Sequence, residues 1–155
     1  MTDDFLIGQR LPLLAKHAGV WTGTYTFVTP KLEVLDRYDF RIDVSFPQDG
    51  LGRRTYRQES DYLWPDGRTQ SLVFEGVLEG EEIVFDNGRI AGRMRALDDR
   101  TLYLTFGFTA QPGVEVCEML QLSADGLSRA RTWHWFRDER LFQITLVDER
   151  REGAA

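Results

Sequence analysis

The sequence predicts an all-β protein: a closed or nearly closed up-and-down antiparallel barrel of about ten strands, preceded by a short helical or turn segment. From Trp21 onward, apolar and polar residues alternate, which is typical of strands with one buried face. Turn residues interrupt the alternation about every 8 to 14 positions. Ten sequential strands in a flat sheet would leave two long exposed edges, and closure removes both. A two-sheet sandwich is the alternative.

The N-terminal segment, residues 4–16, differs from the rest of the chain. Its apolar residues, among them Phe5, Leu6 and Leu11, are interrupted by Gly8 and Pro12, which disfavour a long helix. We therefore expect at most a short helix or a turn-rich segment here, placed as a plug or lid on the barrel. No helical periodicity follows it.

The strands are separated by glycine and Asx residues, which accept the positive φ of tight turns. Asn87-Gly88 is the strongest hairpin signal, and a further turn is expected at Gln111-Pro112-Gly113. The charged tail from Glu149 onward is expected to fray. The expected strands span residues 21–29, 38–46, 54–64, 69–78, 82–87, 89–97, 101–111, 114–122, 128–137 and 141–150.

Length and charge limit the classes of function. A chain of 155 residues builds one core, so residues 1–155 are expected to form a single domain. The net charge of -6 argues against nucleic acid and membrane surfaces as partners. One cysteine, Cys117, and two histidines cannot build a disulfide or the usual zinc sites, so no metal or cofactor is expected. Because Asp3 and Asp4 stand where a signal peptide carries positive charge, we expect the cytoplasm.

The first strand begins Gly19-Val20-Trp21-Thr22-Gly23-Thr24-Tyr25. This resembles the Gly-X-Trp opening of the calycin superfamily, the lipocalin and fatty-acid-binding-protein group, and particularly the bacterial lipocalin-like proteins of the DUF3598 and nitrobindin type. The resemblance implies that Trp21 closes the base of a barrel and that a basic residue on a late strand packs over its indole. Arg129, Arg131 and Arg137 are the candidates for that cation–π contact.

The same resemblance raises haem binding as an outside hypothesis. Nitrobindin-type proteins hold haem through a histidine late in the chain, and His134 lies in a comparable strand. Nitrobindin-type proteins also carry a glycine-rich motif around the first strand, and this sequence lacks it. The alternative is that His134 is a hydrogen-bonded structural residue.

Strand parity suggests a cavity with a partly polar wall. With Trp21 inward, Tyr25 is inward too, because successive side chains point to opposite faces. A barrel of ten strands is wider than one filled by its own side chains. The alternative is that the aromatic residues simply pack a core. The candidate ligand-binding residues are Tyr25, Phe40, Tyr56, Gln58, Tyr62, Phe74, Phe106, Glu118 and His134.

Glu118 stands out because the parity of its apolar neighbours would bury its carboxylate. Such a group must find a partner, take up a proton, or cost several kcal/mol. Three explanations remain open: a bulge that returns Glu118 to solvent, an inward arginine that neutralises it, or a role in proton transfer.

The strand at residues 128–137 leaves its inward face undecided. One face carries His134 between small and aromatic residues, and the other carries arginines and tryptophans, including Arg131, Trp133 and Trp135. If the tryptophans and arginines point inward, the interior suits an anionic or aromatic ligand. If they point outward, they form an aromatic patch that suggests a homodimer surface.

Three functions are compatible with this sequence. The first is binding of a small hydrophobic or aromatic molecule inside the barrel, as the calycin resemblance implies. The second is a cofactor-independent cyclase, isomerase or dehydratase in the same cavity, with Glu118, His134 and Tyr56 as the proton-transfer residues. The third is an interaction module with a plugged interior.

Overall fold

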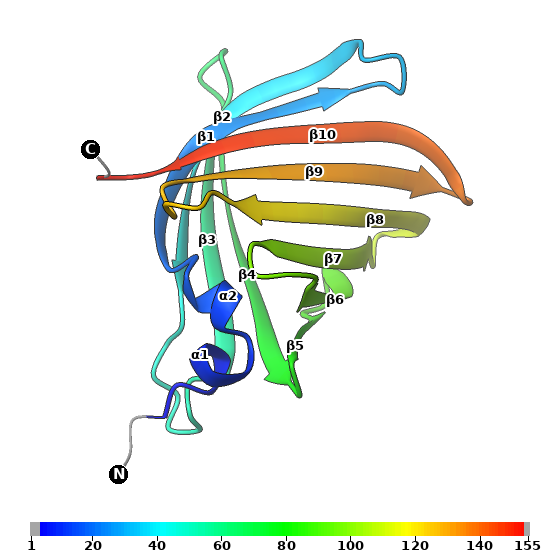
Figure 1. Ribbon diagram of the computed structural model, residues 1–155. Helices are drawn as coiled ribbons and strands as arrows, with labels where there is room; N and C mark the ends of the chain where they lie inside the picture. The colour runs from blue at the N-terminus through cyan, green and yellow to red at the C-terminus, as the bar shows by residue number, and fades with distance from the viewer. Residues whose placement is uncertain (1–3, 154–155) are drawn as a thin grey trace.

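The computed structural model describes residues 4–153 and has the predicted all-β architecture (Figure 1). Ten strands pair in sequence order, and β1 and β10 close the barrel. The prediction of a closed up-and-down antiparallel barrel is therefore confirmed. The strands are β1 (Gly19–Val28), β2 (Val34–Ser45), β3 (Thr55–Leu63), β4 (Thr69–Glu79), β5 (Glu82–Asp86), β6 (Ile90–Ala96), β7 (Thr101–Phe108), β8 (Gln111–Leu122), β9 (Ser128–Arg137) and β10 (Arg140–Arg151).

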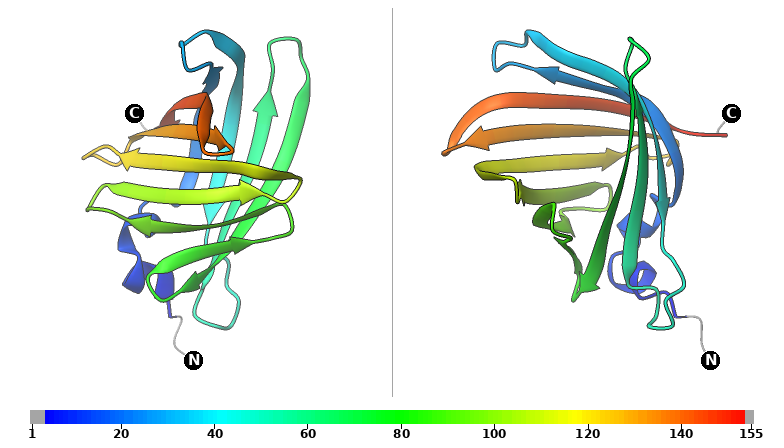
Figure 2. Two further views of the ribbon diagram at one scale, coloured as in Figure 1. Left: turned by 90° about the vertical axis from the view of Figure 1, so that its right-hand side faces the viewer. Right: turned by 180° about the vertical axis from the view of Figure 1, so that it is seen from behind.

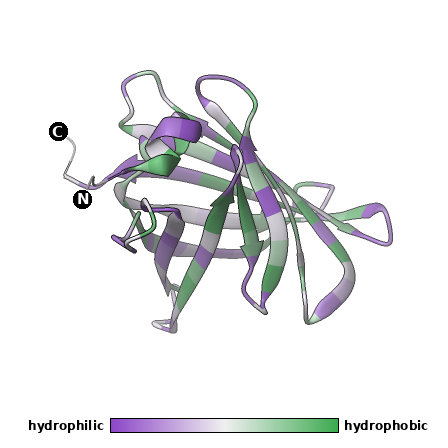
Figure 3. Cartoon of the chain, turned by 90° about the horizontal axis from the view of Figure 1, so that it is seen from below, coloured by the Kyte–Doolittle hydropathy of each residue, from purple (hydrophilic) through white to green (hydrophobic). Residues whose placement is uncertain are grey.

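Closure rests on β1, which pairs with a strand on each side. Tyr25 lies opposite Tyr38 on β2 and opposite Val147 on β10, so the first strand has no free edge. The two views of Figure 2 show the strands wrapping continuously around the interior. Alternation of hydrophobic and hydrophilic residues runs along the strands in Figure 3, as expected when one face is buried and the other faces water.

The largest differences from the predicted strand spans lie at two turns. β2 begins at Val34, four residues before the expected start, because the turn after β1 is tight and Leu32 adopts a φ of 67° there. The expected turn at Gln111-Pro112-Gly113 lies inside β8, and the chain reverses at Thr109–Ala110 instead. A register shift at Phe108 and a positive φ at Gly113 absorb the irregularity.

Two short helices, α1 (Leu6–Arg10) and α2 (Pro12–Ala15), plug one end of the barrel, as the N-terminal pattern predicts. Ile7 and Leu14 are fully buried, and the backbone N–H of Leu6 donates to the carbonyl of Gly52 in the loop after β2. The residues described include no helix that is both long and apolar enough to cross a membrane.

Trp21 forms the floor of the barrel above this plug and is 0% exposed. Its Nε1 donates to the carbonyl oxygen of His17 at 3.0 Å. The guanidinium of Arg129 lies 4.6 Å from the Trp21 ring centroid, and that of Arg151 lies 4.4 Å from it. The predicted stacking of a late-strand arginine over Trp21 is confirmed for Arg129, and β10 supplies a second cation.

Candidate functional site

The barrel encloses a cavity of about 220 Å³, on the order of seven water molecules in the liquid. Most of its wall is aromatic or aliphatic, and a few polar side chains gather in one part of it. Eight of the ten strands contribute one or more of the aromatic or charged groups. The lining residues are Tyr25, Phe27, Tyr38, Tyr56, Gln58, Tyr62, Gln70, Leu72, Phe74, Phe85, Ile90, Met94, Leu104, Phe106, Phe108, Glu118, Leu120, Arg131, Trp133 and Trp135.

The cavity opens at the end of the barrel opposite Trp21. Along β1, Trp21 and Tyr25 are buried and Phe27 is partly exposed. Along β9, Arg131 is buried, whereas Trp133 is partly exposed. Burial thus decreases in the same direction on two strands, which places the polar residues deep and the mouth beyond them.

Aromatic rings surround the mouth. Phe27 and Tyr38 stack with ring centroids 5.6 Å apart, and Tyr38 contacts Trp64 at 4.3 Å. On the other side, Phe108 and Trp135 stack nearly parallel at 5.4 Å. These contacts hold broad apolar faces in fixed positions around the entrance.

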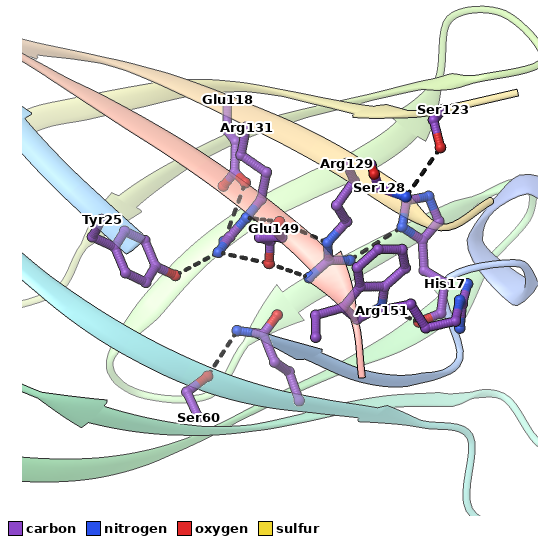
Figure 4. A network of polar contacts seen from close by, with 12 residues as sticks. His17, Tyr25, Ser60, Glu118, Ser123, Ser128, Arg129, Arg131, Glu149 and Arg151 are labelled. Carbon is purple, nitrogen blue, oxygen red and sulfur yellow. Dashed lines mark hydrogen bonds and ion pairs between the residues drawn. The ribbon is translucent and has the colours of Figure 1, made fainter. Parts of the chain in front are cut away.

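The inward face of β9 carries the arginines and tryptophans. Arg129 donates to Glu149 through Nε at 2.7 Å and Nη2 at 2.9 Å, and Arg131 Nε donates to Glu149 Oε2 at 3.0 Å (Figure 4). Burial opposes the ionisation of Glu149, but Arg131 and then Arg129 outweigh it and hold its pKa below the ordinary value. Glu149 is therefore a buried carboxylate shared by two guanidinium groups.

Arg131 also joins the floor to the cavity wall. Its Nη2 donates to the hydroxyl oxygen of Tyr25 at 2.8 Å, and its Nη1 lies 3.7 Å from Oε2 of Glu118. Burial lowers the pKa of Arg131, but Glu149, Tyr25 and Glu118 outweigh it and raise that pKa, so the guanidinium stays charged. Arg131 is thus a fixed positive charge at the deep end of the cavity.

Glu118 is held by fewer contacts than Glu149. Burial raises its pKa to about 7, because the favourable effect of Arg131 offsets only part of the cost of removing the carboxylate from water. The negative charge of Glu149 repels the Glu118 carboxylate and raises the Glu118 pKa further. Glu118 therefore exchanges its proton near neutral pH, while Glu149 stays ionised.

The opposite wall carries a short chain of hydrogen bonds on β3. The hydroxyl of Tyr56 donates to Gln58 Oε1 at 2.7 Å, and Gln58 Nε2 donates to Ser60 Oγ at 3.0 Å. Burial raises the pKa of Tyr56 to about 12, so its hydroxyl keeps its proton at neutral pH. This wall offers neutral hydrogen-bonding groups.

The structure brings together seven of the nine predicted lining residues, which contact one cavity: Tyr25, Tyr56, Gln58, Tyr62, Phe74, Phe106 and Glu118. Phe40 is buried behind the wall, where its ring lies 4.6 Å from that of Tyr25.

The placement of His134 is corrected. Its side chain is exposed on the outer surface of the barrel, paired in register with Cys117 and Ile144. It therefore cannot line the cavity, act as a proton-transfer residue there, or hold haem inside the barrel. The inward orientation of Trp133 and Trp135 also removes the aromatic outer patch that suggested a homodimer surface.

The sequence did not point to Glu149 as part of the site, and the expectation that the chain frays from this residue is wrong. Glu149 is 3% exposed, because β10 continues to Arg151 and Glu149 pairs with Arg129 of β9. Strand parity could have found it: Glu149 lies two residues after the inward Val147, so its side chain points to the same inner face.

Ten closed antiparallel strands, a helical plug, a tryptophan floor and an internal cavity define a calycin-like β-barrel. The sequence matches the family described as domain of unknown function DUF3598, N-terminal, over residues 9–154. The chain belongs to this family. No curated protein matches the sequence.

Solved structures share the barrel fold at low sequence identity. A DUF3598-family protein of unknown function from Nostoc punctiforme superposes with a TM-score of 0.65 at 18% identity, covering 89% of this chain and 48% of that one. This chain thus spans about half the length of that relative. The S-type phycobiliprotein lyase CPES from Guillardia theta gives a TM-score of 0.73 at 12% identity, covering 94% and 93%. Rv2717c from M. tuberculosis gives 0.66 at 12% identity, covering 92% and 97%.

Proposed function

We propose that this protein binds a small hydrophobic or aromatic molecule in the cavity of the barrel. The observation that carries the proposal is a cavity of about 220 Å³ with apolar walls, a few polar groups at its deep end and a mouth edged by aromatic rings. This combination is typical of small-molecule sites. The similarity to the phycobiliprotein lyase supports it only through the shared fold.

A neutral fluorescent probe tests this function. N-phenylnaphthylamine emits strongly only in apolar surroundings, so the protein is expected to enhance its emission with a stoichiometry of one. Leu72→Trp should block binding, because Leu72 lines the cavity and a larger side chain occupies its space. Val73→Trp is the matched control, since Val73 is exposed on the outer face of the same strand. Equal binding by both variants would contradict the proposal.

A second candidate function is acid–base catalysis on the bound molecule. The observation that favours it is the pKa of about 7 at Glu118, which lets one carboxyl group both donate and accept protons near neutral pH. Tyr56 adds a neutral hydroxyl on the facing wall. His134 has no part in this mechanism, since it lies outside the barrel.

Nitrobenzisoxazole, a general probe of buried bases, tests the catalytic candidate. The Glu118 carboxylate would remove the ring C–H proton as the N–O bond breaks, which releases a coloured cyanonitrophenolate. The rate should rise with pH through about 7 and vanish in Glu118→Gln. A rate unchanged by this substitution would exclude Glu118 as a base.

A further inference from the structure

Two nitrogen donors at the deep end of the cavity lack an acceptor at hydrogen-bond distance. Trp133 Nε1 is buried and faces the Glu118 carboxylate, which helps to lower the pKa of that carboxyl, but among residues 4–153 it reaches no acceptor at ordinary hydrogen-bond geometry. Arg131 uses its Nε and Nη2 on Glu149 and Tyr25, but its Nη1 faces Glu118 Oε2 at 3.7 Å, too far for a hydrogen bond.

The two donors and the Glu118 carboxylate share one corner of the cavity. Trp133 lies directly opposite Glu118 across β8 and β9, and Arg131 is two residues from Trp133 on the same face. A buried donor without an acceptor is unfavourable, so this corner favours a ligand that brings acceptor oxygens.

The buried charges favour an anion in the same corner. Arg129 and Arg131 carry two positive charges, and Glu149 neutralises one of them. Glu118 can neutralise the second only in its ionised form, and then without a hydrogen bond to Arg131. A ligand carboxylate supplies both the negative charge and a pair of acceptor oxygens, and its charge-assisted hydrogen bonds are shorter than the present ion pair.

We propose, building on the binding function above, that the ligand is an aromatic carboxylic acid whose carboxylate accepts hydrogen bonds from Arg131 Nη1 and Trp133 Nε1 while Glu118 takes up a proton from solvent. The aromatic part of the ligand then lies toward the mouth, among rings such as Phe106 and Trp135. The buried charge stays balanced, since the ligand carboxylate replaces that of Glu118.

The groups that face Glu118 are compatible with its uptake of a proton when the ligand carboxylate binds. Tyr25, Tyr56 and Tyr62 stay protonated, because burial raises the pKa of each hydroxyl. Leu104 on β7, which pairs with Glu118, has no titratable group, and neither do the cavity residues on β4, β5 and β6. The titratable and charged groups around Glu118 are Arg129 and Arg131 on β9, Glu149 on β10, Tyr25 on β1, and Tyr56 and Tyr62 on β3.

Calorimetric titration with naphthoate, its neutral amide and naphthalene tests the inference. Wild-type protein should bind naphthoate about tenfold more tightly than naphthamide at about pH 6, since hydrogen bonds to a charged group are the stronger ones. Above the Glu118 pKa of about 7, the Kd for naphthoate should rise about tenfold per pH unit, with uptake of one proton per ligand. The proton uptake is measured by repeating the titration in buffers of different ionisation enthalpy.

Variants separate the roles of the residues. Glu118→Gln should abolish the pH dependence and bind naphthoate at about pH 9 roughly a hundredfold more tightly than wild type does. Trp133→Phe keeps the ring but removes the donor, so it should weaken naphthoate binding about tenfold and leave naphthalene binding unchanged. This variant tests the inference even if Glu118→Gln does not fold. His134→Ala, on the outer surface, is the control.

Two results would overturn the inference while the proposed binding function stands. One is binding of naphthoate at about pH 9, above the Glu118 pKa, without proton uptake. The other is tighter binding of naphthamide than of naphthoate at about pH 6, weakened by Glu118→Gln, which would mean that Glu118 accepts a hydrogen bond from a neutral ligand. If N-phenylnaphthylamine and all three naphthalene probes fail to bind, the proposed function is wrong as well.

Discussion

Glu118→Gln should make the folded protein more stable at alkaline pH. The pKa of Glu118 in the folded state is about 7, whereas the ordinary value is 4.5. At 1.36 kcal/mol per unit, ionisation of this buried group costs about 3 kcal/mol of folding free energy. Because the folded state holds the proton more tightly than the unfolded state, the cost develops as pH rises from about 4.5 to 7 and is complete above 7. Glutamine keeps the shape of the side chain but cannot ionise.

Urea denaturation from about pH 4.5 to pH 8 measures this effect. The free energy of unfolding of Glu118→Gln, relative to wild type, should increase by about 3 kcal/mol across this range, equivalent to roughly 6–12 °C in melting temperature. Comparing the two proteins at each pH cancels the titration of all other groups. Glu115→Gln, an exposed carboxylate on the same strand, is the matched control and should give no such trend. Parallel stability curves for wild type and Glu118→Gln would refute the reasoning.

Three further substitutions test the framework around the cavity. Trp21→Ala should lower stability by about 3–5 kcal/mol in a urea melt, since it removes the fully buried floor of the barrel, and near-unchanged melting would mean that Trp21 is not a core residue. Glu149→Gln should cost about 3–5 kcal/mol, because Arg129 and Arg131 lose their shared counter-charge, and a loss below about 1 kcal/mol in the same assay would contradict the buried network. His134→Ala should change stability by less than about 0.5 kcal/mol, and a large loss would show that the histidine is packed rather than exposed.

Strand periodicity was sufficient to predict the barrel, because one-sided burial leaves a clear alternation in strands such as β2, where Phe40, Ile42 and Val44 face inward. The alternation is a local pattern, which a single sequence contains. The tryptophan floor and the arginine over Trp21 followed instead from the family resemblance that the Gly-X-Trp opening carries.

The orientation of β9 could not be predicted from its own residues, because both faces carry aromatic and polar side chains. It is decided by contacts from other strands: Arg129 stacks on Trp21, and Glu149 of β10 receives both arginines. His134 was misplaced for the same reason, since inward Arg131 requires outward His134 on a regular strand. Glu149 was missed because it stands in a charged C-terminal run that is typical of solvent-exposed tails.

The indole N–H signals of the four tryptophans offer the most direct test of the central claim, that an aromatic acid binds at the inner end of the cavity. In ¹H–¹⁵N spectra, added naphthoate should move the signal of Trp133 most and that of Trp135 next, since both line the cavity. The signal of Trp21, bonded to the His17 carbonyl beneath the cavity, should stay in place, as should that of Trp64, bonded to Asp36. A spectrum in which Trp133 does not respond, or in which only Trp64 does, would contradict the account.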